Sequence, residues 1–184
     1  MYKRSSPMLF RTLLCLTGAS LLAAAAPSRA DGANVAHWQT IVGLIQPANL
    51  VGSGTGQVAG GGQPWTTTGG EAGVNLSNGD AGFRVRGLVL AGGNGVGTRA
   101  TIAEVQGTLV CDTNGSAGGG NSVLVDTPAV PLSATGDARF SGNLGALPAA
   151  CSEPDIAFLV RISAGGVASR WIANGAVLRQ DEGD

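Results

Sequence analysis

Short runs of alternating apolar and polar residues, separated by glycine-rich turns, follow one another through most of this 184-residue chain, which contains 31 glycines. The richest turns lie at 92–95, 115–120 and 165–166. No segment after residue 30 shows the 3.6-residue apolar periodicity of an amphipathic helix. Because glycine weakens helices and adopts the backbone angles of tight turns, the pattern indicates short strands. We therefore predict an all-β fold, an antiparallel β-sandwich, with a small β-barrel as the alternative.

The clearest hairpin is predicted over residues 71–91, around the Asn-Gly pair at 78–79. Asn-Gly is typical of tight hairpin turns because both residues adopt positive φ angles readily. Further strands are predicted at 37–45, 98–112, 122–132, 138–144, 155–163 and 167–178. Pro128 and Pro131 cannot donate ladder hydrogen bonds, so 122–132 is expected to be an edge strand or two short pieces.

One apolar cluster is expected at the centre of the fold. Its members are apolar residues of the predicted strands: Phe83, Val85, Val89, Phe140, Phe158, Val160, Ile162 and Trp171. Arg161 alternates with Val160 and Ile162, so its side chain is expected to reach solvent from the opposite face.

The first thirty residues have the order of a secretory signal. Basic residues precede an apolar stretch at 12–26, and small residues precede Asp31. The apolar stretch is shorter than the roughly 20 residues that span a membrane. We predict a signal peptide at 1–30, a single β-rich domain at 31–184, secreted or periplasmic localisation, and no integral membrane segment after cleavage. Residues 49–70 have little apolar content and are expected to form a mobile glycine-rich loop.

Cys111 and Cys151 are the two cysteines that remain after the predicted signal. In an oxidising compartment, such a pair is expected to form a disulfide. With His37 as the only histidine, they cannot complete a zinc site without carboxylates, so we predict no metal and no cofactor. Residues 112–116 place oxygen-bearing side chains at alternate positions, as calcium loops do. Val123 stands where such a loop needs glutamate, and a calcium-stabilised module is kept as a third hypothesis.

After residue 30 the chain carries an excess of negative charge, because all twelve of its carboxylates lie there and it has no lysine in this part. The cations are the scattered arginines Arg84, Arg86, Arg99, Arg139, Arg161, Arg170 and Arg179. Binding to nucleic acid needs a clustered basic surface. We therefore expect no nucleic-acid partner.

No catalytic residue can be assigned from the sequence. The single histidine, His37, is accompanied by no GxSxG motif, which argues against a serine hydrolase. A pair of carboxylates can cleave glycosides, and nothing selects two from Glu71, Asp80, Glu104, Asp112, Asp126, Asp137, Glu153 and Asp155. Trp65 is the one candidate ligand-binding residue, because it lies between Gly-Gly-Gln-Pro and three threonines and an exposed tryptophan can stack on a sugar.

The stretches GFRVRGLVLAGG, VQGTLVCD, VPLSATGDARFSG, LPAACSEPDIAFLVRI and RWIANGAVLR, between Gly82 and Arg179, resemble a group of small exported bacterial β-proteins without an assigned function. The resemblance implies an all-β fold and the pairing of Cys111 with Cys151, and it carries no active site. A looser likeness is to the CHRD domain, whose paired histidines are absent here.

Besides the calcium-stabilised module, two functional hypotheses follow. The favoured one is an exported, non-enzymatic β-sandwich protein with a binding, adhesion or envelope-structural role, whose unknown ligand is a carbohydrate or a protein. The alternative is a secreted carbohydrate-active hydrolase that uses paired carboxylates.

Overall fold

The structure is a computed structural model that describes residues 34–117, 119–152 and 154–181. The predicted signal peptide and Glu153 lie outside these residues. Within them, the elements are β-strands and two 3₁₀ turns, η1 (Gly54–Gly56) and η2 (Ala149–Ser152). The predicted all-β class is therefore confirmed. No helix in the described part of the chain is long and apolar enough to cross a membrane.

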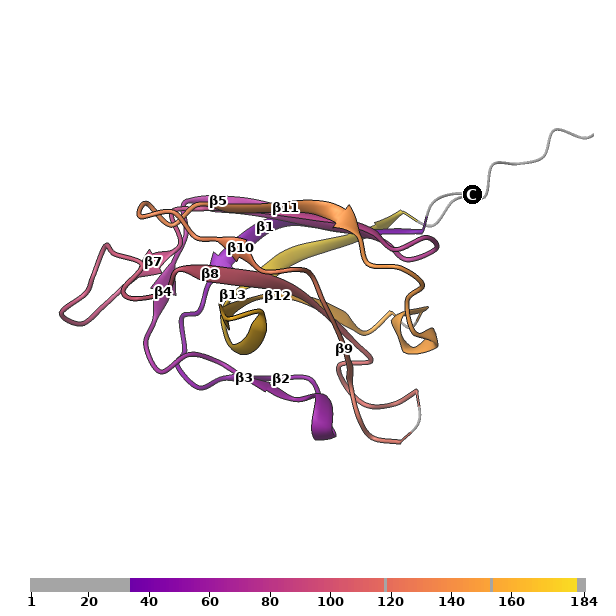
Figure 1. Cartoon of the computed structure of the whole chain (residues 1–184). Helices are drawn as coiled ribbons and strands as arrows, with labels where there is room; N and C mark the ends of the chain where they lie inside the picture. The colour runs from indigo at the N-terminus through magenta and orange to yellow at the C-terminus, as the bar shows by residue number, and fades with distance from the viewer. Residues whose placement is uncertain (1–33, 118, 153, 182–184) are drawn as a thin grey trace, which may run out of the picture. The chain divides into compact units, whose positions relative to one another are not determined.

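Nine antiparallel strands form the main sheet, in the order β10-β8-β12-β13-β1-β5-β6-β11, with β9 paired to β8. The strands are β1 (Val35–Gly43), β5 (Gly69–Asn75), β6 (Asp80–Arg86), β8 (Glu104–Cys111), β9 (Val123–Asp126), β10 (Val130–Pro131), β11 (Ala138–Asn143), β12 (Ile156–Ala164) and β13 (Val167–Asp181). The sheet curls until its edge strands β10 and β11 contact each other. As Figure 1 shows, β1, β5 and β11 then form one layer above β8, β12 and β13.

The predicted strands agree with this sheet, and one turn differs in detail. Pairing of β5 with β6 confirms the predicted hairpin. Only Gly79 of the Asn-Gly pair has a positive φ, +79°, and its N–H donates to the carbonyl of Asn75. The turn is therefore longer than a two-residue Asn-Gly turn. Residues 122–132 form two short strands, β9 and β10, as their prolines predict.

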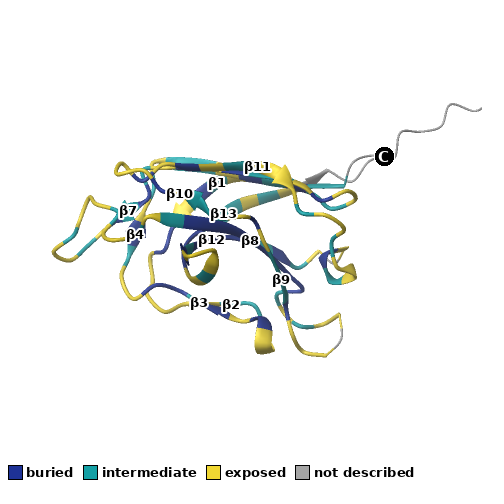
Figure 2. Ribbon diagram, in the orientation of Figure 1, coloured by how far each residue is buried: buried dark blue, intermediate teal, exposed yellow. Residues whose placement is uncertain are grey.

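The space between the two layers is filled by aromatic rings. Phe158 on β12 lies 5.6 Å, between ring centroids, from both Trp38 on β1 and Phe83 on β6. Phe140 on β11 extends the cluster, 6.3 Å from Phe83. A Cβ atom at Gly107 of β8 would lie 2.7 Å from the Phe158 ring, so glycine is required there. Burial of Phe83, Val85, Phe158 and Val160 confirms the centre of the expected core, which Figure 2 shows in dark blue along the central strands. Phe140 and Ile162 are only partly buried. The expectation that Val89 shares a strand face with Phe83 is wrong, because β6 ends at Arg86 and Val89 lies beyond it, half-buried.

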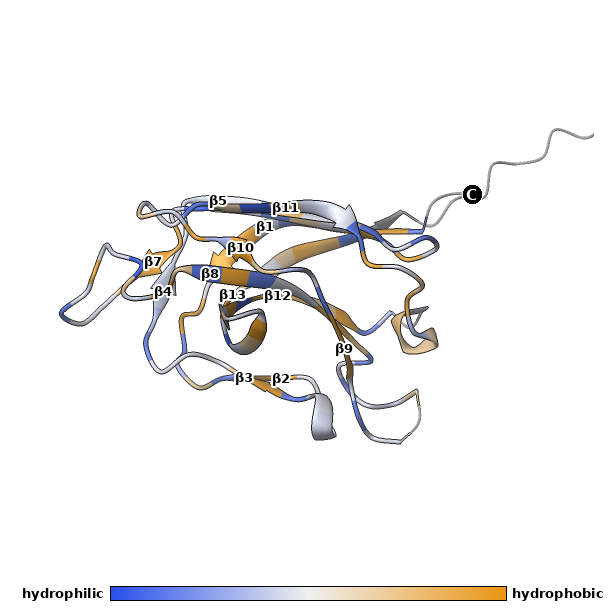
Figure 3. Cartoon of the chain, viewed as in Figure 1, coloured by the Kyte–Doolittle hydropathy of each residue, from blue (hydrophilic) through white to orange (hydrophobic). Residues whose placement is uncertain are grey.

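A second packing layer covers the opposite face of β12 and β13. It contains two small sheets, β2 (Leu50–Val51) with β3 (Val58–Ala59), and β4 (Trp65–Thr66) with β7 (Val89–Leu90). Two side chains of β13 hold this layer: the indole N–H of Trp171 donates to the Asn49 carbonyl, and Nη1 of Arg170 donates to the Gly60 carbonyl. Figure 3 shows the corresponding apolar colouring of β2 and β3. Residues 49–66 therefore pack against the main sheet, and residues 69–70 begin β5 within it.

Two expectations about this face are wrong. Trp171 is paired with Arg161 between β12 and β13, so it lies on the face opposite Phe158 and does not share the space of Phe140. Arg161 is only 8 % exposed, because its guanidinium is enclosed by bonds to the Ser169 carbonyl and to Asp126. The alternation of side chains along β12 correctly predicts that Arg161 and Phe158 lie on opposite faces, but both faces of β12 are covered.

The disulfide joins the end of β8 to η2. Cys111 and Cys151 are bonded, with 4.6 Å between their Cα atoms and 40 residues between them in sequence. Both cysteines are buried. The predicted pairing is confirmed, and it ties the 112–150 excursion, which includes β9, β10 and β11, to the centre of the sheet.

Candidate functional site

The outer face of β1, β5, β6 and β11 carries a row of small residues. Cross-strand partners lie on the same face of a sheet. Gly73 on β5 is the partner of both His37 on β1 and Gly82 on β6, and Gly82 is in turn the partner of Ser141 on β11. We call this four-residue row the glycine trough. It crosses three inter-strand spacings of ~4.8 Å, which gives a length of about 14 Å.

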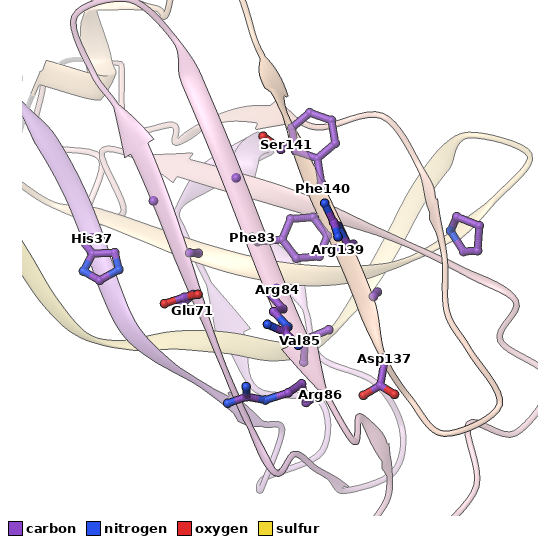
Figure 4. A pocket seen from close by; sticks show the side chains of 15 residues that line it. His37, Glu71, Phe83, Arg84, Val85, Arg86, Asp137, Arg139, Phe140 and Ser141 are labelled. Carbon is purple, nitrogen blue, oxygen red and sulfur yellow. The ribbon is translucent and has the colours of Figure 1, made fainter.

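The trough is a hollow in the surface of the described domain. Two adjoining depressions share Gly73, Gly82 and Ser141 in their linings, with volumes of about 950 Å³ and 550 Å³. Figure 4 shows the larger one, with His37 at one end and the side chains of β6 and β11 at the other. The hollow therefore crosses β1, β5, β6 and β11 at the glycine trough, and on either side of the trough it also extends along the strands, over residues 80–86 of β6.

The backbone does not require glycine at the centre of the trough. Neither Gly73 nor Gly82 has a positive φ. A Cβ atom at Gly73 would make only an ordinary contact, 3.7 Å from the His37 ring, and one at Gly82 would lie 3.3 Å from the Phe140 carbonyl. Glycine inside a strand weakens it and often marks close approach of a ligand. Glycine at position 73 therefore lowers the stability of the strand, and no packing contact requires it.

One wall of the trough is rich in arginine. Arg84 on β6 is the cross-strand partner of Glu71 on β5 and of Arg139 on β11. Arg86 lies two residues further along β6, on the same face, and all three arginines are exposed. Figure 4 shows them together beside the groove. Like charges directly opposite each other destabilise a sheet.

These three guanidinium groups form no ion pair among the described residues, where the only salt bridge joins Arg161 to Asp126. They are therefore available to an anionic ligand. Sequence reasoning missed the cluster because Arg139 is distant in sequence from Arg84. The alternation of Arg84 and Arg86, together with Arg139 in another predicted strand, was the available signal.

The opposite wall is formed by amides and a carboxylate that is already bonded. Asp80 on β6 accepts hydrogen bonds from the Nδ2 atoms of Asn143 and Asn78, at 2.7 and 2.9 Å. Asn75, Asp80 and Asn143 line the smaller depression. This wall offers neutral donors and acceptors and a fixed negative charge, so the two walls differ in electrostatic character.

Two carboxylates lie on the arginine side, Glu71 and Asp137. Asp137 precedes β11, and its oxygens accept hydrogen bonds from the Thr135 hydroxyl, at 2.7 Å, and from the Gly87 N–H, at 3.1 Å. The bond from Thr135 has the largest effect on the pKa of Asp137, and together with the Gly87 bond and the positive charge of Arg84 it holds this pKa below its ordinary value of 3.8. Asp137 is therefore an ionised acceptor that orients the turn rather than a source of protons at neutral pH.

The other residues considered from the sequence lie elsewhere. Trp65 is on β4, paired with Leu90, and is 5 % exposed, whereas stacking on a sugar needs an open ring face. Glu104 begins β8, in the other layer of the sheet. Asp112 is buried beyond the end of β8. Among the described residues, no three side chains of the His, Cys, Asp and Glu types come together as a metal site.

A comparison with known protein families, with curated proteins and with solved structures finds no match for this chain. The resemblance to small exported bacterial proteins stays a prediction. The chemistry of the trough is therefore the basis for a functional assignment.

Proposed function

We propose that this protein is an exported, non-enzymatic binding protein that holds an anionic ligand in the glycine trough. The single observation behind this proposal is a bare floor, Gly73 and Gly82, beside arginines that have no ion-pair partner in the described structure. A planar guanidinium binds carboxylate, sulfate or phosphate groups through paired hydrogen bonds. The floor lets a ligand approach the backbone, and the arginine wall supplies attraction.

The alternative, a carbohydrate-active hydrolase, receives less support from the trough. Such an enzyme needs one carboxyl group that donates a proton and a second that acts as base or nucleophile. Glu71 and Asp137 are the carboxylates that line the larger depression. The oxygens of Asp137 are held by Thr135 and Gly87, and its lowered pKa opposes a role as proton donor.

Export is supported by two features. The predicted signal at 1–30 directs the chain to the secretory route. The buried disulfide between Cys111 and Cys151 is consistent with an oxidising compartment. We therefore propose secreted or periplasmic localisation.

The proposal is tested by an NMR titration of the purified protein with glucuronate and, separately, with inorganic sulfate. We expect amide shifts concentrated at Gly73, Gly82 and Ser141, with apparent Kd values in the millimolar range. The double variant Arg84→Gln/Arg139→Gln should lose most of this response. The control Arg170→Gln removes a positive charge outside the trough and should retain it. Absence of trough shifts with both anions, or an equal response in the double variant, would contradict the proposal.

A further inference from the structure

We propose, resting on the function proposed above, that the ligand is a linear acidic polysaccharide that crosses β1, β5, β6 and β11. Its anionic groups face Arg84 and Arg139, and its sugar rings lie over Gly73 and Gly82. Three features support this assignment: the length of the trough, the backbone of β5 and β6, which is hydrogen-bonded on both sides, and the different charges of the two walls.

The trough suits an extended molecule. Its length of about 14 Å, from three strand spacings, exceeds the size of one sugar ring. On the far side of Ser141 no strand pairs with β11, and Pro131 of β10, which contacts β11, lines the same depression. At the other end, Arg179 on β13 is the cross-strand partner of His37 and is exposed. A chain can therefore enter and leave the groove, and a further cation lies where it would continue.

The sheet backbone disfavours a peptide in this groove. Peptides that bind sheets usually add a strand to an open edge, where backbone groups are unpaired. The trough instead crosses β5 and β6, which are paired on both sides. A ligand in it must be recognised by side chains and by contact with the bare floor. The faces of sugar rings, which present C–H groups and no long side chains, fit such a floor.

The difference between the walls fixes the orientation of charge. Arg84, Arg86 and Arg139 lie on one side together with the carboxylates Glu71 and Asp137, so cations are in excess there. On the other side lies Asp80, held by Asn143 and Asn78. An anionic group near Asp80 would be repelled, whereas the same group near Arg84 would be attracted. A polymer with a carboxylate or sulfate on each repeat presents several such groups to the arginine side, so its binding gains from effective concentration.

The test is calorimetric titration of the purified protein with polygalacturonate, heparin, polyglutamate, neutral dextran and monomeric galacturonate. We expect at least one acidic polysaccharide to bind ten-fold or more tightly, per chain, than galacturonate, and binding should weaken as salt rises. Dextran should not bind. A preference for polygalacturonate assigns carboxylate groups to the ligand, and a preference for heparin assigns sulfate groups.

Gly73→Val fills the floor of the trough with a residue that strands favour. We expect this variant to lose at least ten-fold in polysaccharide affinity while its thermal midpoint stays equal or rises. Gly62→Val is the matched control, because a Cβ atom at Gly62 has no neighbour within 4 Å and this residue lies outside the trough. It should bind as the unmodified protein does.

Three results would overturn the polysaccharide assignment alone: equal affinity for polymer and monomer, tighter binding of polyglutamate than of either polysaccharide, or unchanged polysaccharide affinity in Gly73→Val. In each case the small-anion shifts at Gly73 and Gly82 would still support an anion site. Absence of those shifts would instead overturn the proposed function itself.

Discussion

The guanidinium of Arg161 on β12 pairs with the carboxylate of Asp126 on β9, with 3.3 Å between Nη1 and Oδ1. The same guanidinium donates to the carbonyls of Ser169 and Ala168 on β13. Arg161 therefore links three strands from a buried position on the face opposite the aromatic cluster. Removal of its side chain would leave those two carbonyls and the carboxylate without this partner.

We predict that Arg161→Ala lowers the free energy of unfolding by about 1 to 3 kcal/mol, because partly buried acceptors lose a charged donor. Arg84→Ala, at an exposed position, should cost under about 0.5 kcal/mol. Urea unfolding measures both values. A double-mutant cycle with Asp126→Ala should show coupling between the two side chains, and equal small losses for Arg161→Ala and Arg84→Ala would contradict the buried pair.

Phe158→Ala should cost about 3 to 5 kcal/mol, because it opens a cavity between Trp38 and Phe83. That loss is large against a typical domain stability of roughly 5 to 15 kcal/mol. Chemical unfolding followed by tryptophan fluorescence measures it. The matched control is Val167→Ala, at the exposed first residue of β13, which should change stability little.

Reduction of the Cys111–Cys151 bond should lower stability by up to about 4 kcal/mol, the chain-entropy value for a closed loop of this length. The double variant Cys111→Ser/Cys151→Ser should show a comparable loss and become insensitive to reductant. Thermal unfolding with and without dithiothreitol tests both statements. A thiol titration of the unfolded, unreduced protein should detect no free thiol from these two residues.

The lowered pKa of Asp137 makes a small contribution to stability that depends on pH. Since the folded pKa lies below the ordinary value of 3.8, the contribution is present above that value and is lost as pH falls through the folded pKa. Thr135→Val removes the largest cause and should raise the pKa of Asp137 toward 3.8. A ¹³C NMR titration of the side-chain carboxyl measures it, and an unchanged pKa would exclude the Thr135 hydroxyl as the main cause.

The sequence alone predicted the strands and the disulfide, because both follow from local rules. Alternation of Phe83 and Val85 with arginines marks a strand that is buried on one face, whatever its neighbours are. The two cysteines after residue 30 allow only one intramolecular pairing. Pro128 separates β9 from β10 because a missing N–H weakens any ladder, and Pro131 is accommodated because β10 is an edge strand.

The tertiary structure decided what covers each face and which distant residues meet. Alternation placed Arg161 opposite Phe158, but only the tertiary structure, which brings Asp126 of β9 and the Ser169 carbonyl of β13 to its guanidinium, turned a surface arginine into a buried one. The glycine trough likewise depends on tertiary structure. Gly73, Gly82 and Ser141 form one row, and Arg84 faces Arg139, only because β11 pairs with β6 in this register. Register between strands far apart in sequence depends on the fit of whole faces in the curled sheet, and no local pattern encodes it.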